Sequence, residues 1–589
     1  MPITPQITPE LLAVSRGDAA ADLLLTNARI INVFSREIET ANVAIHAERI
    51  AGVGDYTLAK RTIDLKGAYL APGFIDAHMH VESTFLPPSQ FVTLAAPRGT
   101  TGVVLDPHEI ANVLGIPGIR FIMDDAAGLP INAMFALSSC VPSSPLENSG
   151  ATLTAADLEP LFADPRVVAL AEMMNFPGVV HADPGVLAKI NLGLHHRIVD
   201  GHAPGLTGHA LQAYAAAGIS SDHECTTAAE AREKLRLGIR IFIREGSAAR
   251  NLEALLPAIT PATIGRFCFC TDDRHPADLV DEGHIDHIVR RAIALGLDPI
   301  AAICIATINP ARHYRQRDLG AVAPGYFADL IVFDHLNAPN PRAVYHHGRL
   351  VAQDGRYLGP SGPGGTGVLE GPPVLARPHV PKSALKLPPL SESSFRIPAA
   401  PNAARIRVIG MDPHQLVTAS LAMPPKVERG EYVADISRDL LKLAVIERHR
   451  ATGNIGRGFI HGFALTAGAI ASTVGHDSHN LAVLGTNDAD MLAAAKALES
   501  CGGGQCAVRD GQVLALLPLP IAGLMSDQPA QTVIRQQADL LAAASSLGCP
   551  HHDPFMPLSF MPLPVIPHLK LTDLGLVDVD QFKVVPLEC

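Results

Sequence analysis

Eight short apolar runs alternate with helix-like segments between residues 73 and 322, and this alternation constrains the fold more than any other feature. Segments such as TAADLEPLFADP and TAAEAREKLRLG separate the runs. Eight β/α units within about 250 residues are the pattern of a TIM-like (β/α)8 barrel. We therefore predict an α/β fold with such a barrel at residues 73–322. The runs are FIDAHMH, TTGVVLDP, INAMFALSS, VVALAEMM, IVDGHAP, ISSDHE, RIFIREG and RFCFCTD.

Short strand-like runs separated by turns flank the predicted barrel on both sides. ADLLLTNARIINV, NVAIHAERIAGVG and RTIDLKGAYLAPG precede it, and LGAVAPGYFADLIVFDHL and AVYHHGRLVAQDGRYL follow it. We expect these strands to form one small β-sandwich domain, split into residues 1–72 and 323–358. Residues 7–17 predict a short helix that Thr8 caps and Pro9 begins.

A chain of 589 residues is too long for one core, so we expect a further domain after these. Residues 359–403 are rich in Pro and Gly, which predicts a linker or an extended wrapping segment. Residues 404–589 predict a C-terminal α/β domain. NDADMLAAAKALESCGGG is its clearest helix, with an Asn/Asp start and glycines after it. AVRDGQVLALL predicts a hairpin with an Asp-Gly turn.

Charge and composition limit the kinds of binding partner and the cellular compartment that we expect for this protein. The net charge is −12 and no long basic block occurs, which argues against nucleic acid and acidic membrane surfaces. The sequence has no run of about 18 apolar residues and no signal-peptide pattern at its start. Nine thinly spread cysteines suit a reducing compartment. We expect a cytoplasmic homo-oligomer, a dimer or larger, that binds a small molecule.

Residues able to bind metal stand at the ends of the predicted barrel strands. His78 and His80 share one face of the first strand, because side chains two positions apart in a strand point the same way. Each candidate alone is more often a loop residue than a ligand. Together they lie where barrel active sites are built, which predicts a metal centre. The further candidates are Glu172, His202, His223, Asp272 and Asp273.

The combined motifs resemble the amidohydrolase superfamily of metal-dependent hydrolases over nearly the whole chain. The split β unit, the barrel and PGFIDAHMH carry this resemblance. The sequence is similar to the adenine deaminase branch in HMHVES, LDPHEIANVLG, DGHAPGL, SDHE, CTDDRHP, STVGHDSHN and LPVIPHLKLTD. The resemblance implies hydrolytic deamination of adenine, the substrate, to hypoxanthine and ammonia by a metal-bound hydroxide, a reaction of purine salvage.

The resemblance also implies a binuclear site of divalent metals, with Mn(II) or Fe(II) preferred and Zn(II) as the alternative. His78 and His80 match the ligands of the more buried metal. Glu172 matches the carboxylate that bridges the two metals. His202 and His223 match the ligands of the second metal.

Two residues are expected to handle protons. Asp272 matches the aspartate that binds metal and moves a proton from the nucleophile to the leaving amino group. Glu82 is our candidate for the proton donor to ring nitrogen N1. Other residues are expected to hold substrate, bind an accessory metal or support the ligands: His108, Glu109, Asp273, His476, Asp477 and His479.

Two alternatives remain open on the sequence alone. Another cyclic amidohydrolase, such as a hydantoinase, a dihydroorotase or a different purine or pterin deaminase, would carry the same metal ligands. The C-terminal domain favours adenine deamination over these activities. A non-catalytic barrel scaffold is the second alternative, although such proteins usually lose ligands and all six expected positions hold competent residues here.

Overall fold

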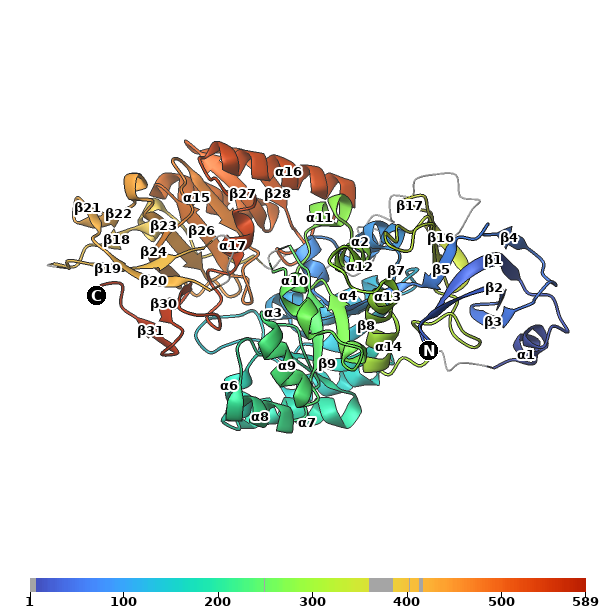
Figure 1. The fold of residues 1–589 in the computed structure, drawn as a ribbon. Helices are drawn as coiled ribbons and strands as arrows, with labels where there is room; N and C mark the ends of the chain where they lie inside the picture. Colours follow the sequence, from blue (N-terminus) through green and yellow to red (C-terminus); the bar gives the residue numbers. More distant parts are fainter. Residues whose placement is uncertain (1–6, 248, 360–384, 402, 413–416) are drawn as a thin grey trace.

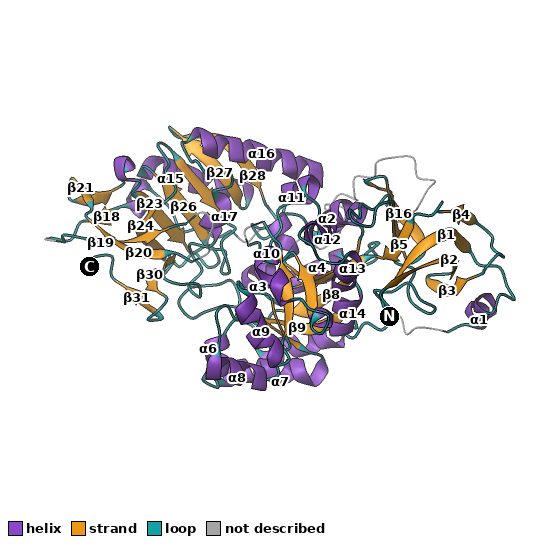
Figure 2. Ribbon diagram, in the orientation of Figure 1, coloured by secondary structure: helices purple, strands orange, loops and turns teal. Residues whose placement is uncertain are grey.

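The computed structural model describes residues 7–247, 249–359, 385–401, 403–412 and 417–589. Three regions follow one another along the molecule (Figure 1). A mixed sheet of strands from before and after the central region lies at one end. Parallel strands surrounded by helices occupy the centre, and the C-terminal sheets lie at the other end (Figure 2). No helix in the described ranges is long and apolar enough to cross a membrane.

A nine-stranded sheet joins chain segments from both sides of the central region. The chain leaves this sheet after β5 and returns to it at β14, and these two strands pair antiparallel. Pairing runs continuously through the sheet, because β4 and β5 both pair with the long strand β1. The strands are β1 (Leu23–Asn32), β2 (Glu37–His46), β3 (Arg49–Gly54), β4 (Thr62–Asp64), β5 (Tyr69–Pro72), β14 (Leu330–Phe333), β15 (Ala343–His346), β16 (Arg349–Gln353) and β17 (Arg356–Tyr357).

The predicted N-terminal helix is confirmed as α1 (Pro9–Ser15). Thr8 precedes it in an extended conformation, and its hydroxyl accepts a hydrogen bond from the Leu11 amide at 3.1 Å. Pro9 begins the helix, where its missing N–H costs nothing. Leu11 and Val14 are buried, which fixes α1 against the N-terminal strands.

The eight predicted apolar runs of the centre all form strands, and all of them pair in parallel. β6 to β10 form one sheet and β11 to β13 form a second. Single parallel bridges, Met79 with Asp272 and Val199 with Ile219, link the two sheets at both pairs of edges. The strands are β6 (Phe74–Met79), β7 (Thr100–Leu105), β8 (Asn132–Leu137), β9 (Val167–Met173), β10 (Val199–Gly201), β11 (Ser221–Asp222), β12 (Arg240–Arg244) and β13 (Phe267–Cys270).

Helices cover the central strands, so even the polar residues within them, such as Asp76 and His78 in β6, are buried. β6, β7, β9 and β13 are buried at every position, as expected for parallel strands covered on both faces. The candidate site residues of these strands lie at or just beyond their carboxyl ends. The main helices are α2 (Pro88–Ala95), α3 (His108–Leu114), α4 (Ile116–Asp125), α7 (Pro184–His196), α8 (Gly208–Ala216), α9 (Ala228–Arg236), α12 (Ile285–Ala294) and α13 (Pro299–Ala306).

The C-terminal region is built on an eight-stranded sheet in the order β20-β19-β24-β23-β26-β25-β27-β28. The predicted helix is confirmed as α15 (Asp488–Cys501), which Asn487 caps and Gly502 ends in a left-handed conformation. The predicted hairpin is confirmed between β27 and β28. The sheet strands are β19 (Ile406–Gly410), β20 (Ala419–Met423), β23 (Leu441–Ile446), β24 (Ile455–His461), β25 (Ala469–Ser472), β26 (Leu481–Gly485), β27 (Gly504–Arg509) and β28 (Gln512–Pro518).

Smaller elements complete this region. Most of the predicted linker, residues 360–384, lies outside the described residues. Phe395 is buried in the same hydrophobic cluster as the inner face of α15, so the C-terminal packing begins before residue 404. The remaining elements are β18 (Ile397–Pro398), β21 (Lys426–Glu428), β22 (Glu431–Val433), α16 (Ala530–Ser546), α17 (Phe555–Ser559), β29 (Leu569–Thr572), β30 (Gly575–Asp578) and β31 (Lys583–Val585).

Candidate metal centre and active site

The structure brings the predicted metal ligands together at the carboxyl ends of the central strands. β6 and the residue after it carry the two histidines of the first motif, and β9 carries the glutamate near its end. The other three residues directly follow β10, β11 and β13 or lie one or two positions beyond them. Side chains that are distant in sequence thus surround one point: His78, His80, Glu172, His202, His223 and Asp272.

Asp272 faces the two histidines of the first strand. Its Oδ1 lies 3.2 Å from Nε2 of His78 and 3.2 Å from Nε2 of His80. Its Oδ2 accepts a hydrogen bond from Arg244 at 3.0 Å. Burial acts to raise the pKa of Asp272, but the Arg244 guanidinium and the facing imidazoles hold that pKa well below its usual value. Asp272 is therefore a carboxylate at neutral pH.

Glu172 contacts both groups of histidines through different oxygens. Its Oε2 lies 2.7 Å from Nδ1 of His202 and 3.1 Å from Nε2 of His223. Its Oε1 lies 3.3 Å from Nε2 of His80. A carboxylate placed in this way can bridge two cations.

The hydrogen-bonding pattern of His80 shows that a cation fits between these groups. Its Nδ1 lies 3.0 Å from the carbonyl oxygen of Asp106, which can only accept, so Nδ1 carries a proton. A neutral ring then points the Nε2 lone pair at carboxylate oxygens of Glu172 and Asp272. Nε2 of His78 is also buried, with no hydrogen-bond partner among the described residues. Lone pairs that face one another repel, and a divalent cation bound by all of them removes the repulsion.

Protons compete with metal for this site. Burial disfavours the charged form of His223, but Glu172 and the neighbouring carboxylates raise the pKa of His223 to about 9. Without metal this ring is therefore protonated at neutral pH, whereas metal binding needs its neutral form. We expect the affinity of the metal-free protein for Mn(II) to rise with pH up to about 9, on the order of tenfold per pH unit for each proton released. Titrations of chelator-treated protein at several pH values measure this slope, and a flat profile would contradict it.

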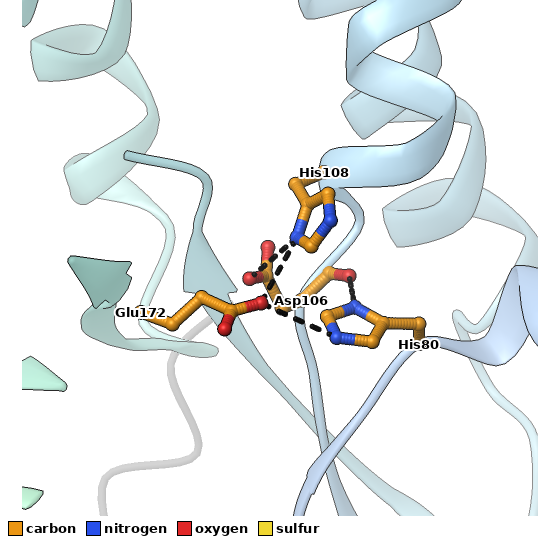
Figure 3. Close-up of side chains that lie close together, drawn as sticks. All are labelled: His80, Asp106, His108 and Glu172. Carbon is orange, nitrogen blue, oxygen red and sulfur yellow. Dashed lines mark hydrogen bonds and ion pairs between the residues drawn. The ribbon is translucent and has the colours of Figure 1, made fainter. Parts of the chain in front are cut away.

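Asp106 positions two of the histidines (Figure 3). Its backbone carbonyl holds His80, and its Oδ2 lies 3.1 Å from Nδ1 of His108. Nδ1 of His108 also lies 3.3 Å from Oε1 of Glu172. Asp106 is not among the residues predicted from the sequence, although it directly follows β7 and therefore lies at a strand end like the predicted residues.

Glu224 and Arg244 are two further polar residues of the site that were not predicted from the sequence. They form a two-pronged ion pair in which Nη2 of Arg244 lies 3.1 Å from Oε2 of Glu224. Oε1 of Glu224 lies 3.6 Å from Nε2 of His223 and 3.7 Å from Nδ1 of His202. The sequence does contain a feature that could have identified Arg244. It is a charged residue at the end of the apolar run RIFIREG, and a buried charge needs a partner.

The C-terminal loop that carries GHDSHN reaches the same site. Nδ1 of His476 lies 2.7 Å from Oε1 of Glu109, and Nε2 of His479 contacts the other oxygen of Glu109. Oδ1 of Asp477 lies 4.0 Å from Nε2 of His108. These residues therefore join two regions that are more than 360 positions apart in sequence.

The predicted catalytic residue Glu82 lies beside the site but is not among the residues that line its cavity. The alternation of His78, His80 and Glu82 would place all three on one strand face, but β6 ends at Met79 and a 3-10 helix begins at Val81. Oε1 of Glu82 accepts a hydrogen bond from the Ile110 amide at 3.1 Å. Burial raises the pKa of Glu82 to about 7.

A cavity lies where the central strands meet the C-terminal region. The central region lines it with polar residues, namely His80, His108, Glu109, Glu172, His202, Glu224, Arg244, Asp272 and Asp273. Asp273 also accepts a hydrogen bond from the Ser83 hydroxyl. The C-terminal region adds His476, Asp477, Phe560, Leu563 and Ile566. The cavity therefore combines histidines and carboxylates from the central region with an aromatic and apolar surface from the C-terminal region.

Comparison with known proteins agrees with this geometry. Residues 69–351 match the amidohydrolase family, and residues 415–583 match the adenine deaminase C-terminal domain. The chain is 48% identical to "Adenine deaminase" of Desulfatibacillum aliphaticivorans over 582 residues, 99% of this chain and 100% of that protein. It is also 48% identical to "Adenine deaminase" of Dehalococcoides mccartyi over 582 residues, 98% of this chain and 99% of that protein.

Solved structures with a similar arrangement are more distant. A β-aspartyl dipeptidase from Fervidobacterium islandicum covers 58% of this chain and 98% of its own, with 16% identity and a TM-score of 0.44. A dihydropyrimidinase from Brevibacillus agri covers 57% of this chain and 96% of its own, with 18% identity and a TM-score of 0.43. From the near-complete match to the curated relatives, this chain belongs to the adenine deaminase family of amidohydrolases.

Proposed function

We propose that this protein catalyses the hydrolytic deamination of adenine to hypoxanthine and ammonia. The observation that carries the proposal is the 48% identity to adenine deaminases over 99% of the chain. The match includes the C-terminal region, which contributes part of the cavity lining. A family relation restricted to the metal ligands would leave hydantoinases and other cyclic amidohydrolases equally well supported.

We further propose that β6 to β13 close into one (β/α)8 barrel and that its rim holds two divalent metals. The two seams between the parallel sheets, at Met79–Asp272 and Val199–Ile219, support closure. His78, His80 and Asp272 would hold one metal and His202 and His223 the other, with Glu172 between them. Imidazole and carboxylate donors suit Mn(II), Fe(II) and Zn(II), and we propose Mn(II) or Fe(II).

The other predictions also stand as proposals. They comprise the domain boundaries at residues 72, 322, 358 and 403, a cytoplasmic location, and assembly into a homo-oligomer. The continuous nine-stranded sheet, which combines residues 23–72 with residues 330–357, supports the split N-terminal domain.

The chain's own residues move the protons of the reaction. A bound divalent metal lowers the pKa of water towards 7 and so supplies hydroxide at neutral pH. Asp272 stays ionised beside His78 and His80, where it can accept the proton of the nucleophile. The same carboxyl group then protonates the departing amino group, which leaves as ammonia. Arg244 fixes the orientation of Asp272 through its second oxygen.

Attack at C6 places charge on N1, which needs a proton donor. The sequence predicts Glu82 for this role, but Glu224 lines the cavity, and its Oε1 lies within 4 Å of two proposed metal-binding histidines. Glu224 is a carboxylate while it is paired with Arg244, so it must first take up a proton. We therefore propose that Glu224 accepts the proton released when water becomes hydroxide and passes it to N1, and that Glu82 supports the site from outside the cavity lining.

The variant Glu224→Gln is expected to lower kcat/KM for adenine by roughly 10²-fold or more, the usual contribution of a general acid. Glutamine keeps an oxygen that can accept a hydrogen bond from Arg244. The fall in kcat/KM therefore reflects the lost proton transfer to N1 and not a lost contact with Arg244. Glu82→Gln is the matched comparison and should cost less. If Glu82→Gln caused the larger loss, while Glu224→Gln stayed near wild type, the role would return to Glu82.

A screen for ammonia release tests the activity itself. Adenine should be turned over, and adenosine, guanine, hydantoin and dihydroorotate serve as competing substrates. Turnover of a hydantoin without turnover of adenine would overturn the proposal. Purified protein that holds no metal and gains no activity with Mn(II) would instead support the scaffold.

A further inference from the structure

On the basis of the proposed function, we propose that the C-terminal domain forms the base-reading side of the site. His476 would make a hydrogen bond from Nε2 to one nitrogen of the purine ring. His476 lines the cavity together with Phe560, Leu563 and Ile566 of the same domain. The central region supplies the hydrolytic groups, so these C-terminal residues are placed to hold the ring and not to attack it.

The orientation of the His476 ring is fixed by two contacts. Its Nδ1 lies 2.7 Å from Oε1 of Glu109, and a carboxylate oxygen only accepts, so Nδ1 donates. One face of the ring stacks on Phe560, with 4.4 Å between ring centroids and 11° between ring planes. Nε2 is the remaining polar atom of the ring, and no described hydrogen bond uses it. Burial acts to lower the pKa of His476, but the facing Glu109 carboxylate raises it to about 9. At neutral pH Nε2 therefore also carries a hydrogen, which it can donate to a ligand in the cavity.

Glu109 is held from its other side by His479. The Gly475 amide donates to Nδ1 of His479 at 3.1 Å, so Nδ1 is unprotonated and Nε2 carries the hydrogen of a neutral ring. Nε2 of His479 is in contact with the second oxygen of Glu109. Because both carboxylate oxygens face histidines of the C-terminal loop, Glu109 serves as a positioning residue for His476.

The C-terminal loop itself is held rigidly. The buried guanidinium of Arg448 donates to the backbone carbonyls of His479 and Ala522, the latter at 2.9 Å. The side chain of Asn480 accepts from the Arg448 amide at 3.3 Å and donates to the Asn148 carbonyl of the central region at 2.8 Å. The loop is therefore fixed to both regions before substrate binds, and a group held in this way loses little entropy on binding.

The chemistry of a purine suits this surface. Its flat ring can lie against Phe560, Leu563 and Ile566, while its edge offers the ring nitrogens N1, N3 and N7. A site that is built to make a hydrogen bond rejects an analogue without the partner, because its own buried group is then left unpaired. His476 should therefore contribute to the choice of substrate as well as to affinity.

Deaza analogues of adenine test this directly, since each replaces one ring nitrogen by CH. Affinities of adenine, 1-deaza-, 3-deaza- and 7-deazaadenine are measured by inhibition or calorimetry in wild type and in His476→Phe. Phenylalanine keeps the stack on Phe560 and removes both ring nitrogens. We expect wild type to bind one analogue roughly 10–100-fold more weakly than adenine, as for the loss of a buried hydrogen bond. In His476→Phe this penalty should shrink to within about 3-fold, and the other two penalties should stay unchanged.

Controls separate the outcomes. The exposed His335 gives the control variant His335→Ala, which should show the same losses of affinity for the deaza analogues as wild type.

Unchanged metal content in His476→Phe shows that the metal site is intact. If His476→Phe does not fold, His476→Gln is used in its place. Glutamine can restore a hydrogen bond, so it should retain part of the penalty. If all three penalties were the same in wild type and His476→Phe, the role of His476 would be overturned. Absence of adenine turnover by wild type would instead overturn the proposed function.

Discussion

Replacing Asp272 by Asn is expected to lower kcat for adenine deamination by roughly 10²–10⁴-fold while the protein keeps most of its metal. Asn retains one oxygen at the position that faces His78 and His80, but it cannot accept and return a proton at neutral pH. Asn is also the best replacement for the backbone, because Asp272 has a φ of 60° and Asn tolerates this left-handed conformation well. The loss therefore reports proton handling more than a distorted loop.

Steady-state kinetics and elemental analysis on the same preparation check this result. Asp298→Asn is the matched control, since Asp298 is exposed and caps α13 by accepting from the Ala301 amide at 2.8 Å. Asn caps helices as well as Asp does, so this control should be indistinguishable from wild type. Near-normal kcat in Asp272→Asn would remove Asp272 from the proton-handling role.

Much of the central fold could be predicted because its signal is local. Each central strand is a short apolar run followed by polar residues, and all eight runs form strands. The convergence of His78, Glu172 and Asp272 then follows from topology, since the carboxyl ends of parallel strands meet at one face. Alternation within one strand was sufficient to pair His78 with His80.

Other features depend on where a strand ends, which the sequence shows less clearly. β6 stops at Met79, so the alternation that selected Glu82 no longer applies at that position. Glu224 directly follows the proposed ligand His223, and a rule that picks one residue per strand end passes over it. Strand patterns also do not show which strands pair, and the pairing of β1 with both β4 and β5 is an example.

Contacts between distant regions are a third class of feature. GHDSHN had the composition of a functional loop, yet its partner Glu109 lies 367 positions earlier in the chain. Nothing local connects the two. Their contact depends on how the C-terminal sheet sits against the central strands, which long-range packing decides.

Replacing Glu172 by Gln is expected to lower the affinity for metal more than any other single conservative substitution in the site. The two oxygens of Glu172 face proposed ligand histidines, at 2.7 Å from His202 and 3.3 Å from His80, so an amide would put a non-ligating NH2 group on one side. It also removes a negative charge that is buried among the imidazoles. The loss of affinity for Mn(II) should exceed the roughly 10–100-fold that changes to outer supporting residues produce, and activity should fall with it.

Equilibrium dialysis of the metal-free protein measures that affinity, and excess Mn(II) should restore only part of the activity of Glu172→Gln. Glu253→Gln is the matched control, because the side chain of Glu253 is 75% exposed and lies 3.9 Å from Arg291, a surface pair of little energetic consequence. If Glu172→Gln bound Mn(II) with wild-type affinity and stoichiometry, Glu172 would not bridge the metals. The carboxylates of Asp272 and Asp106 would then be the ones to test as ligands, because they also face His80 and His108.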